Sequence, residues 1–272
     1  MDKKSILITG AASGIGRETA RLFAGKGWYV GAFDINEAGL KTLEQEIGQV
    51  NCFTGRMDVT DPESVKSGID AFSGKTGGRL DVLLNNAGIL KFARFEDAEL
   101  EASHKIVDVN LKGCLSCIYH ALKYLKETPG ARIINLSSAS AIYGVPELAV
   151  YSATKHALSA VTEALAIELS GRGIKVCDIQ PPYVQTPMLA DSEHVYSIKK
   201  LGVRVQPAQV ARTIWKAAHK DKLHWLMGSG KLLNFLCWLL PVGKGALVKM
   251  LTMGPEGKED RKKSISPQGK AS

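Results

Sequence analysis

The sequence has few cysteines and none of the patterns that direct a chain out of the cytoplasm. Its five cysteines are an odd number at irregular spacing, which does not resemble a disulfide framework. The first residues run directly into Ile6-Leu7-Ile8 and a glycine turn, so they do not form an apolar signal segment with a small-residue cleavage site. We therefore expect a cytoplasmic protein that is not secreted.

Long apolar runs and metal-ligand patterns are also missing. The run Leu232–Leu240 is less than half of the about 20 residues that a membrane-spanning helix needs, so it cannot cross a bilayer. The six histidines show no H-x-x-x-H or similar pairing. Cys114 and Cys117 form a C-x-x-C, but they lie in an amphipathic helical pattern without a second ligand pair. We expect no metal site.

The net charge of +8 is concentrated in one part of the chain. Residues 1–198 carry 20 Lys and Arg against 23 Asp and Glu, whereas the last 74 residues carry 15 against 4. Basicity spread over the whole chain would favour nucleic acid or acidic lipid as a partner. Because only the C-terminal quarter is basic, we expect no nucleic-acid partner for the rest of the chain.

Short apolar runs alternate with helix-length amphipathic stretches up to about residue 180, which is typical of a parallel sheet with crossover helices. The predicted strands are Ser5–Thr9, Trp28–Phe33, Asn51–Arg56, Val82–Asn85, Arg132–Ser137 and Lys175–Ile179, with a last strand within Leu223–Gly228. The predicted helices are Arg17–Gly25, Glu37–Ile47, Pro62–Phe72, Glu99–Lys126 and Ser152–Ser170. No repeat or linker divides the chain, so we predict one α/β domain over residues 1–254 and a disordered polar tail over residues 255–272.

A glycine-rich turn follows the first predicted strand and opens a helix. Gly10 permits a tight turn, Gly14 lets the backbone approach a diphosphate, and Gly16 allows the helix to pack closely on the sheet. Asp34 ends the second strand about 20 residues later, where a carboxylate accepts hydrogen bonds from an adenosine ribose and repels a 2′-phosphate. With Ser13 rather than a basic residue in the turn, we predict NAD in preference to NADP. Arg17 is the one nearby cation that opposes this prediction.

Tyr151 and Lys155 lie four residues apart in a helical pattern, so their side chains share one face. A tyrosine with its ordinary pKa of about 10 is a poor acid or base at neutral pH. A fixed cation beside it favours the phenolate, and we expect Lys155 to lower the pKa of Tyr151 in this way. By itself such a pair is most often a coincidence on a surface helix.

Four further motifs, in a characteristic order and spacing, indicate that the pair of Tyr151 and Lys155 is not a coincidence. The glycine turn, Asp58-Val59, Asn85-Asn86-Ala87-Gly88, Ser138 and the Tyr151/Lys155 pair together resemble the short-chain dehydrogenase/reductase family, over roughly residues 5–190. The resemblance implies a Rossmann fold, a doubly wound parallel sheet of about seven strands with helices on both faces. It also implies a catalytic tetrad, which falls on Asn110, Ser138, Tyr151 and Lys155.

The resemblance assigns a role to each residue of this tetrad. Tyr151 exchanges a proton with the substrate oxygen, and Ser138 hydrogen-bonds that oxygen. Lys155 acts on Tyr151 and reaches the nicotinamide ribose, and Asn110 holds a water that links Lys155 to solvent. The implied cofactor-binding residues are Gly10, Ser13, Gly14, Ile15, Gly16, Asp34, Asp58, Val59, Asn86, Ala87, Gly88, Tyr151, Lys155, Pro181, Val184 and Thr186. Pro182 stands where the family usually has glycine, and it removes an N–H donor from this stretch.

The predicted substrate positions are mostly apolar. They are Ser138, Tyr151, Leu90, Ile142, Tyr183 and Met188, and none offers a partner to a charged substrate group. These positions favour a lipophilic secondary alcohol or ketone of sterol, retinoid or long-chain type. The alternative is a nucleotide-sensing binding protein of the same fold with a basic tail on membrane or nucleic acid, which an intact tetrad disfavours.

The C-terminal segment at residues 223–254 combines leucine and tryptophan with lysine. Three interpretations of it stay open: a lid over the active-site mouth, a contact in a homodimer, and a peripheral helix on an anionic membrane surface. Because this ending departs from that of tetrameric family members, we expect a homodimer.

Overall fold

A computed structural model describes residues 3–228, apart from residues 190–191 and 193–194. The predictions for the segment at residues 229–254 and for the tail at residues 255–272 lie outside the described residues. No helix among the described residues is long and apolar enough to cross a membrane.

Seven parallel strands form one sheet, in the order β3-β2-β1-β4-β5-β6-β7. Their bounds are β1 (Ser5–Thr9), β2 (Tyr29–Asp34), β3 (Cys52–Arg56), β4 (Val82–Asn85), β5 (Arg132–Leu136), β6 (Lys175–Gln180) and β7 (His224–Leu226). The predicted strands agree with these bounds to within two residues at each end, and the doubly wound sheet is confirmed. The strand order reverses between β1 and β4, and open parallel sheets bind their ligands at such a reversal, beyond the carboxyl ends of the strands.

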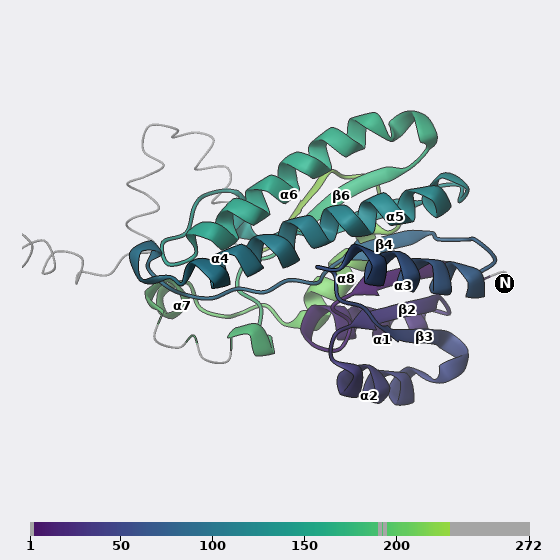
Figure 1. The fold of residues 1–272 in the computed structure, drawn as a ribbon, viewed down its shortest axis with the longest axis horizontal. Coiled ribbons are helices and arrows are strands. Elements are labelled where there is room, and N and C mark those ends of the chain that lie inside the picture. The colour runs from purple at the N-terminus through teal and green to yellow at the C-terminus, as the bar shows by residue number, and fades with distance from the viewer. Residues whose placement is uncertain (1–2, 190–191, 193–194, 229–272) are drawn as a thin grey trace, which may run out of the picture.

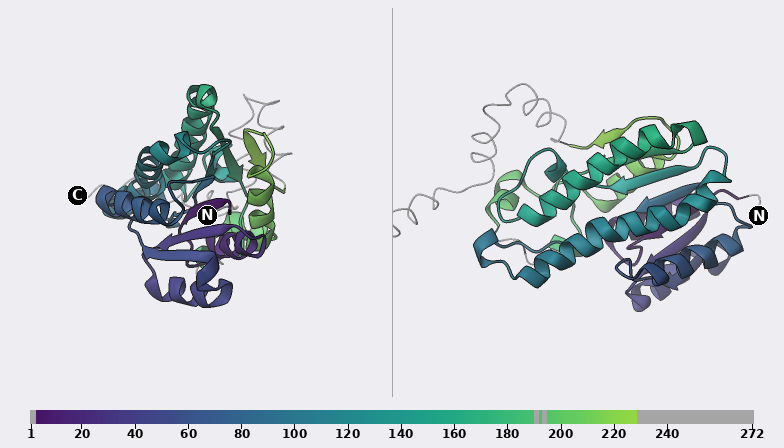
Figure 2. Two further views of the ribbon diagram at one scale, coloured as in Figure 1. Left: turned by 90° about the vertical axis from the view of Figure 1, so that its right-hand side faces the viewer. Right: turned by 45° about the horizontal axis from the view of Figure 1, so that its top comes forward.

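Helices cover both faces of the sheet, because the buried strands are apolar on both sides. In β1, Ile6 and Ile8 face the cluster formed with α1 (Gly14–Gly25), α2 (Glu37–Ile47) and α8 (Pro207–Ala217). Leu7 faces the opposite cluster, formed with α3 (Pro62–Lys75), α5 (Cys114–Lys126) and α6 (Ala149–Glu168). Figures 1 and 2 show the sheet between these two layers, with α5 and α6 running across one face.

The helix starts have local causes. The Asp61 side chain accepts a hydrogen bond from the Glu63 N–H at 3.0 Å, and Pro62 occupies the first turn of α3, where its missing N–H has no partner to lose. At α2 the Asn36 side chain accepts from the Gly39 N–H at 3.0 Å. These caps fix the starts of α2 and α3, which follow Asp34 and Asp58 by a few residues.

The predicted helix Glu99–Lys126 is not uniformly α-helical. It consists of α4 (Leu100–Val107), a π-helical turn at Asp108–Gly113 and α5, drawn as one continuous rod in Figure 1. A π turn inserts one extra residue and is common at functional sites. Here it contains Asn110, whose side chain is 1% exposed. The hydrophobic period shows that the stretch is helical, but it does not reveal the widened turn.

A short helix that the sequence analysis did not predict, α7 (Tyr196–Leu201), lies beyond the carboxyl ends of the strands. Val195, just before the helix, and Ser197 and Ile198 within it are buried. The Tyr183 hydroxyl lies 2.8 Å from the Ser197 hydroxyl, which ties the helix to the loop after β6. Six residues are too few for a hydrophobic period to identify.

Candidate active site

A cavity of about 760 Å³ opens at the carboxyl ends of the strands. Its volume is in the range of small-molecule and cofactor sites. The predicted site residues on its wall are Gly10, Ser13, Gly14, Ile15, Asp34, Asp58, Val59, Asn86, Ala87, Gly88, Leu90, Ser138, Tyr151, Lys155, Pro181, Tyr183, Val184, Thr186 and Met188. Three predicted residues lie behind the wall: Gly16, Asn110 and Ile142.

The N-terminus of α1 forms one end of the cavity. Ser13 precedes the helix without a capping hydrogen bond from its side chain, and the first turn carries no acidic residue. A Cβ on Gly14 would lie 3.2 Å from the Thr186 methyl carbon, so the glycine keeps this approach open. Free N–H groups and the helix dipole at such a terminus suit an anion, so the residues present fit the diphosphate of a dinucleotide.

The loop after β4 is hydrogen-bonded to the glycine turn. The Asn86 side-chain amide donates to the carbonyls of Thr9 at 2.8 Å and of Gly10 at 2.9 Å. The Thr9 hydroxyl accepts from the N–H groups of Asn86 and Ala87, both at 3.1 Å. The two loops therefore form one rigid floor on which a nucleotide can lie.

Asp34 lines the cavity with its carboxylate held by backbone N–H groups. One oxygen accepts from Ala12 N–H at 3.0 Å and the other from Asn36 N–H at 2.9 Å. Arg17 does not line the cavity. Its guanidinium donates to the carbonyls of Ala12 and Gly39 and pairs with Glu46 at 2.7 Å. The cation that opposed the NAD prediction is therefore engaged elsewhere.

Tyr151, Ser138 and Lys155 meet on the cavity wall. The Lys155 ammonium donates to the Leu136 carbonyl at 2.7 Å and lies 5.5 Å from the centre of the Tyr151 ring. Ser138 lies two residues after the end of β5. Its hydroxyl accepts a hydrogen bond from the Ser140 N–H at 3.2 Å. α6 begins at Ala149, three residues before the predicted start, so both Tyr151 and Lys155 are helical and share a face as expected.

The pKa of Tyr151 is not lowered, contrary to the expectation from the sequence. Burial raises the pKa of Tyr151 to about 12, while its hydrogen bond with the Ser138 side chain acts in the opposite direction. Burial also lowers the pKa of Lys155 to about 8. In the protein alone the loss of hydration dominates at both groups, so the pKa of Tyr151 lies above its ordinary value and not below it.

Asn110 is held by a loop backbone. Its side chain accepts from the Ile89 N–H at 2.8 Å and donates to the Ile89 carbonyl at 2.9 Å. A Cβ on Gly88 would lie 3.3 Å from the Asn110 side-chain oxygen and 3.8 Å from the Lys155 nitrogen, so Asn110 lies directly behind these two residues of the wall. The proton-relay role of Asn110 stays a prediction, and its observed contacts are those of a residue that positions the loop after β4.

The comparisons with known proteins agree with this geometry. The family described as short chain dehydrogenase matches residues 4–196. The chain belongs to this short-chain dehydrogenase family. Cyclohexanol dehydrogenase of Acinetobacter sp. (strain SE19) is 31% identical over 218 residues, covering 78% of this chain and 86% of that protein. 3beta-hydroxysteroid dehydrogenase of Mediterraneibacter gnavus is 33% identical, covering 84% of this chain and 79% of that protein.

A solved structure shows the same fold. The crystal structure of a 3-ketoacyl-(acyl-carrier-protein) reductase from Brucella melitensis complexed with NADH matches with a TM-score of 0.75 at 31% identity, covering 82% of this chain and 96% of that chain. This short-chain dehydrogenase is therefore an oxidoreductase that acts on CH–OH groups with NAD or NADP. The alternative of a binding protein without turnover is set aside, because the named relatives are dehydrogenases and reductases.

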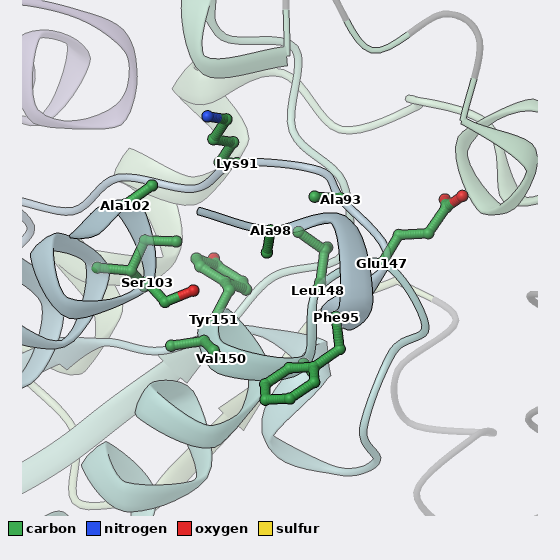
Figure 3. A pocket seen from close by; sticks show the side chains of 12 residues that line it. Lys91, Ala93, Phe95, Ala98, Ala102, Ser103, Glu147, Leu148, Val150 and Tyr151 are labelled. Atoms are coloured by element: carbon green, nitrogen blue, oxygen red, sulfur yellow. The ribbon is translucent and has the colours of Figure 1, made fainter. Parts of the chain in front are cut away.

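A second cavity lies beside the first turn of α6 in this short-chain dehydrogenase (Figure 3). It is bounded by Phe95, Glu147 and Tyr151 among others, and its volume is about 20 Å³. That volume holds about one water molecule. Glu147 points away from Tyr151 in Figure 3, so this cavity adds no charged group to the reacting centre.

The substrate end of the large cavity differs from the sequence expectation at three residues. Ile142 follows a short 3₁₀ turn at Ala139–Ala141 and does not line the cavity; it is buried against Tyr143, Val145 and Leu148, which do line it. Lys200 and Arg204 line the cavity, although the sequence analysis found no partner for a charged substrate group. Lys200 lies within the unpredicted α7 and Arg204 follows it, so no motif marked either residue.

The C-x-x-C of this short-chain dehydrogenase is packed inside it. Cys114 and Cys117 are free thiols on the face of α5 that meets the sheet. Burial raises the pKa of Cys114 to about 12 and raises the pKa of Cys117 as well. Both thiols are therefore protonated at neutral pH and act as small apolar side chains.

Replacing Lys155 by methionine is expected to stabilise the folded protein by about 1–3 kcal/mol at neutral pH, because it removes a buried charge of lowered pKa. The unfolded chain binds the Lys155 proton more readily between pH 8 and the ordinary pKa of 10.5. The stability of the parent therefore rises relative to the variant through that window, and their difference is largest at and below pH 8. Chemical denaturation at several pH values measures this difference, with Lys126→Met, at an exposed position of α5, as the control. If the Lys155→Met variant were less stable than the parent at pH 7, the buried charge of Lys155 would not be destabilising and the prediction would be wrong.

Proposed function

We propose that this short-chain dehydrogenase interconverts a lipophilic secondary alcohol and its ketone, with NAD as the redox partner. The observation that supports it is one cavity whose wall joins the glycine turn and Asp34 at one end to Tyr151, Ser138 and Lys155 at the other. When bound, NAD supplies hydride acceptance and donation. The chain's own residues supply binding, orientation and proton transfer.

Tyr151 is the proposed proton-transfer residue, because it is the hydroxyl on the cavity wall with a buried ammonium beside it. Ser138 is placed to hydrogen-bond the same substrate oxygen. Lys155, with one of its three protons held by the Leu136 carbonyl, keeps two for a ribose and for the Tyr151 region. Protonated Lys155 favours the phenolate during proton transfer, even though burial raises the resting pKa of Tyr151.

The apolar part of the wall supports a lipophilic substrate. Tyr143, Val145 and Leu148 line the cavity and pack in one cluster with Tyr151, Tyr183 and Leu90 at its margin. A screen of secondary alcohols that increase in apolar size, with NADH formation as the readout, tests the proposal. We expect kcat/KM to rise with apolar size. A preference for small polyols over cycloalkanols and sterols would overturn the substrate class while leaving the reaction type intact.

The preference for NAD rests on Asp34. Asp34→Asn retains a side-chain oxygen that can accept from the Ala12 N–H, but it removes the charge that repels a 2′-phosphate. We expect the ratio of kcat/KM for NAD to that for NADP to fall by at least about tenfold. The control is Glu37→Gln, since this exposed carboxylate lies near Arg56 and outside the cavity wall. An unchanged ratio in Asp34→Asn would refute the ribose role.

The partners predicted from the sequence stay predictions. Leu115, Tyr119 and Ile167 are exposed apolar side chains on α5 and α6, and a second copy of the chain would cover such a face in a homodimer. Peripheral membrane contact was predicted for residues outside the described part of the chain.

A further inference from the structure

Basic side chains line the substrate end of the cavity. Lys200 and Arg204 line this end. Among the described residues that line the cavity, the acidic ones are Asp34 and Asp58, both at the nucleotide end. Lys200 lies with its nitrogen 5.7 Å from the centre of the Tyr196 ring. Arg204 has no ion pair or hydrogen bond from its side chain to any residue that the structure describes.

The backbone places Arg204 on the same side as Tyr183. Val184 and Val205 form a parallel bridge, reinforced by the Gln185 N–H donating to the Val205 carbonyl at 2.9 Å. Val184 belongs to a core cluster against which Val205 and Ile15 pack. Because side chains alternate along extended chain, Tyr183 and Arg204, each one residue earlier, face the opposite way. Tyr183 packs on the cluster beside Tyr151, so this side is the substrate side.

Gly202 leaves space for the guanidinium. A Cβ at this glycine would lie 3.4 Å from the Arg204 Nε and 3.7 Å from its Cγ, so the arginine side chain folds across Gly202 at the cavity wall. The Tyr183 and Ser197 hydroxyls, 2.8 Å apart, hold α7 above the same region. Arg204 is therefore directed towards the cavity by the elements around it.

We propose that Arg204 binds a carboxylate at the end of the substrate remote from the reacting alcohol or ketone. A guanidinium presents parallel N–H donors that match the two oxygens of a carboxylate. Apolar side chains that include Val145, Leu148 and Met188 line the same cavity, so the substrate class is an amphipathic hydroxy or keto acid with an apolar body. This assignment rests on the proposed function, because it places both ends of one substrate in the same cavity.

The test is a binding measurement on the full chain saturated with NADH, followed by the change in NADH fluorescence. Fatty acids of graded chain length are compared with their methyl esters, which keep the apolar body and lose the charge. At the best chain length the acid is expected to bind at least about tenfold more tightly than the ester. Arg204→Gln should remove this preference, whereas Arg212→Gln, an exposed arginine on α8 outside the cavity wall, should retain it.

Equal binding of acid and ester by the parent protein, or no binding of either at any length, would overturn the proposal. A weaker Kd for NADH in Arg204→Gln, with the preference for acid unchanged, would assign the guanidinium to the cofactor diphosphate and also overturn it. Failure of the proposed function would appear differently, as turnover that survives loss of the Tyr151 hydroxyl.

Discussion

Tyr151→Phe is expected to lower kcat by about 10²–10⁴-fold, because it removes only the hydroxyl that exchanges the substrate proton. The ring of Tyr151 packs beside the cluster of Tyr143 and Leu148, and phenylalanine retains that packing. The free energy of unfolding and the affinity for NADH should therefore change little. Turnover of the best alcohol found in the screen and NADH fluorescence titration measure the two effects separately.

The matched control is Tyr119→Phe. Tyr119 is 75% exposed on α5 and outside the cavity wall, so its hydroxyl has no reacting partner. Its loss should leave kcat and KM unchanged. If Tyr151→Phe kept the activity of the parent, another group would have to transfer the proton, and the assigned mechanism would be wrong.

Gly16→Ala is expected to lower the free energy of unfolding by about 1–3 kcal/mol and to weaken NADH binding by at least about tenfold. A Cβ at position 16 would lie 2.1 Å from the Gly10 carbonyl oxygen and 2.6 Å from the Asn86 side-chain nitrogen. Neither neighbour can move freely, because Asn86 donates to that same carbonyl at 2.9 Å. Relief of the clash must displace the glycine turn from the loop after β4, which together form the nucleotide floor.

The same helix supplies the control for this substitution. Gly25 ends α1, and a Cβ there would have no heavy atom within 4 Å outside its own helical neighbourhood. Gly25→Ala should leave NADH binding unchanged and alter the stability by no more than about 1 kcal/mol. Equal behaviour of the two variants in denaturation and NADH titration would contradict the close packing assigned to Gly16.

Features that depend on residues close together in the chain were predicted correctly from the sequence. Gly10 follows β1, and Gly14 and Gly16 lie in the first turn of α1, as the order of strand, turn and helix requires. Tyr151 and Lys155 share a helical face because their spacing of four nearly matches a helical turn. Most of the predicted site residues therefore reach one cavity, since parallel strands bring their carboxyl ends to one edge of the sheet.

Other features depended on contacts between distant segments. The spacing of Tyr151 and Lys155 predicted attraction between them, but the burial that reverses the expected pKa shift comes from the strands and loops packed around α6. The side chain of Asn110, in the π turn, is hydrogen-bonded to the backbone of Ile89 in another loop. The hydrophobic period of the helix does not reveal these hydrogen bonds.

The sequence by itself determined the fold and the family, because both follow from residue types in a fixed order along the chain, and it predicted the reacting groups that we propose. Only the tertiary structure decided which charges reach the site. It tied Arg17 to Glu46, off the cavity wall, and it brought Arg204 onto that wall beside the bridge between Val184 and Val205. Charge acts through space over several ångströms, and the positions of charges far apart in the chain are set only when the segments that carry them pack together.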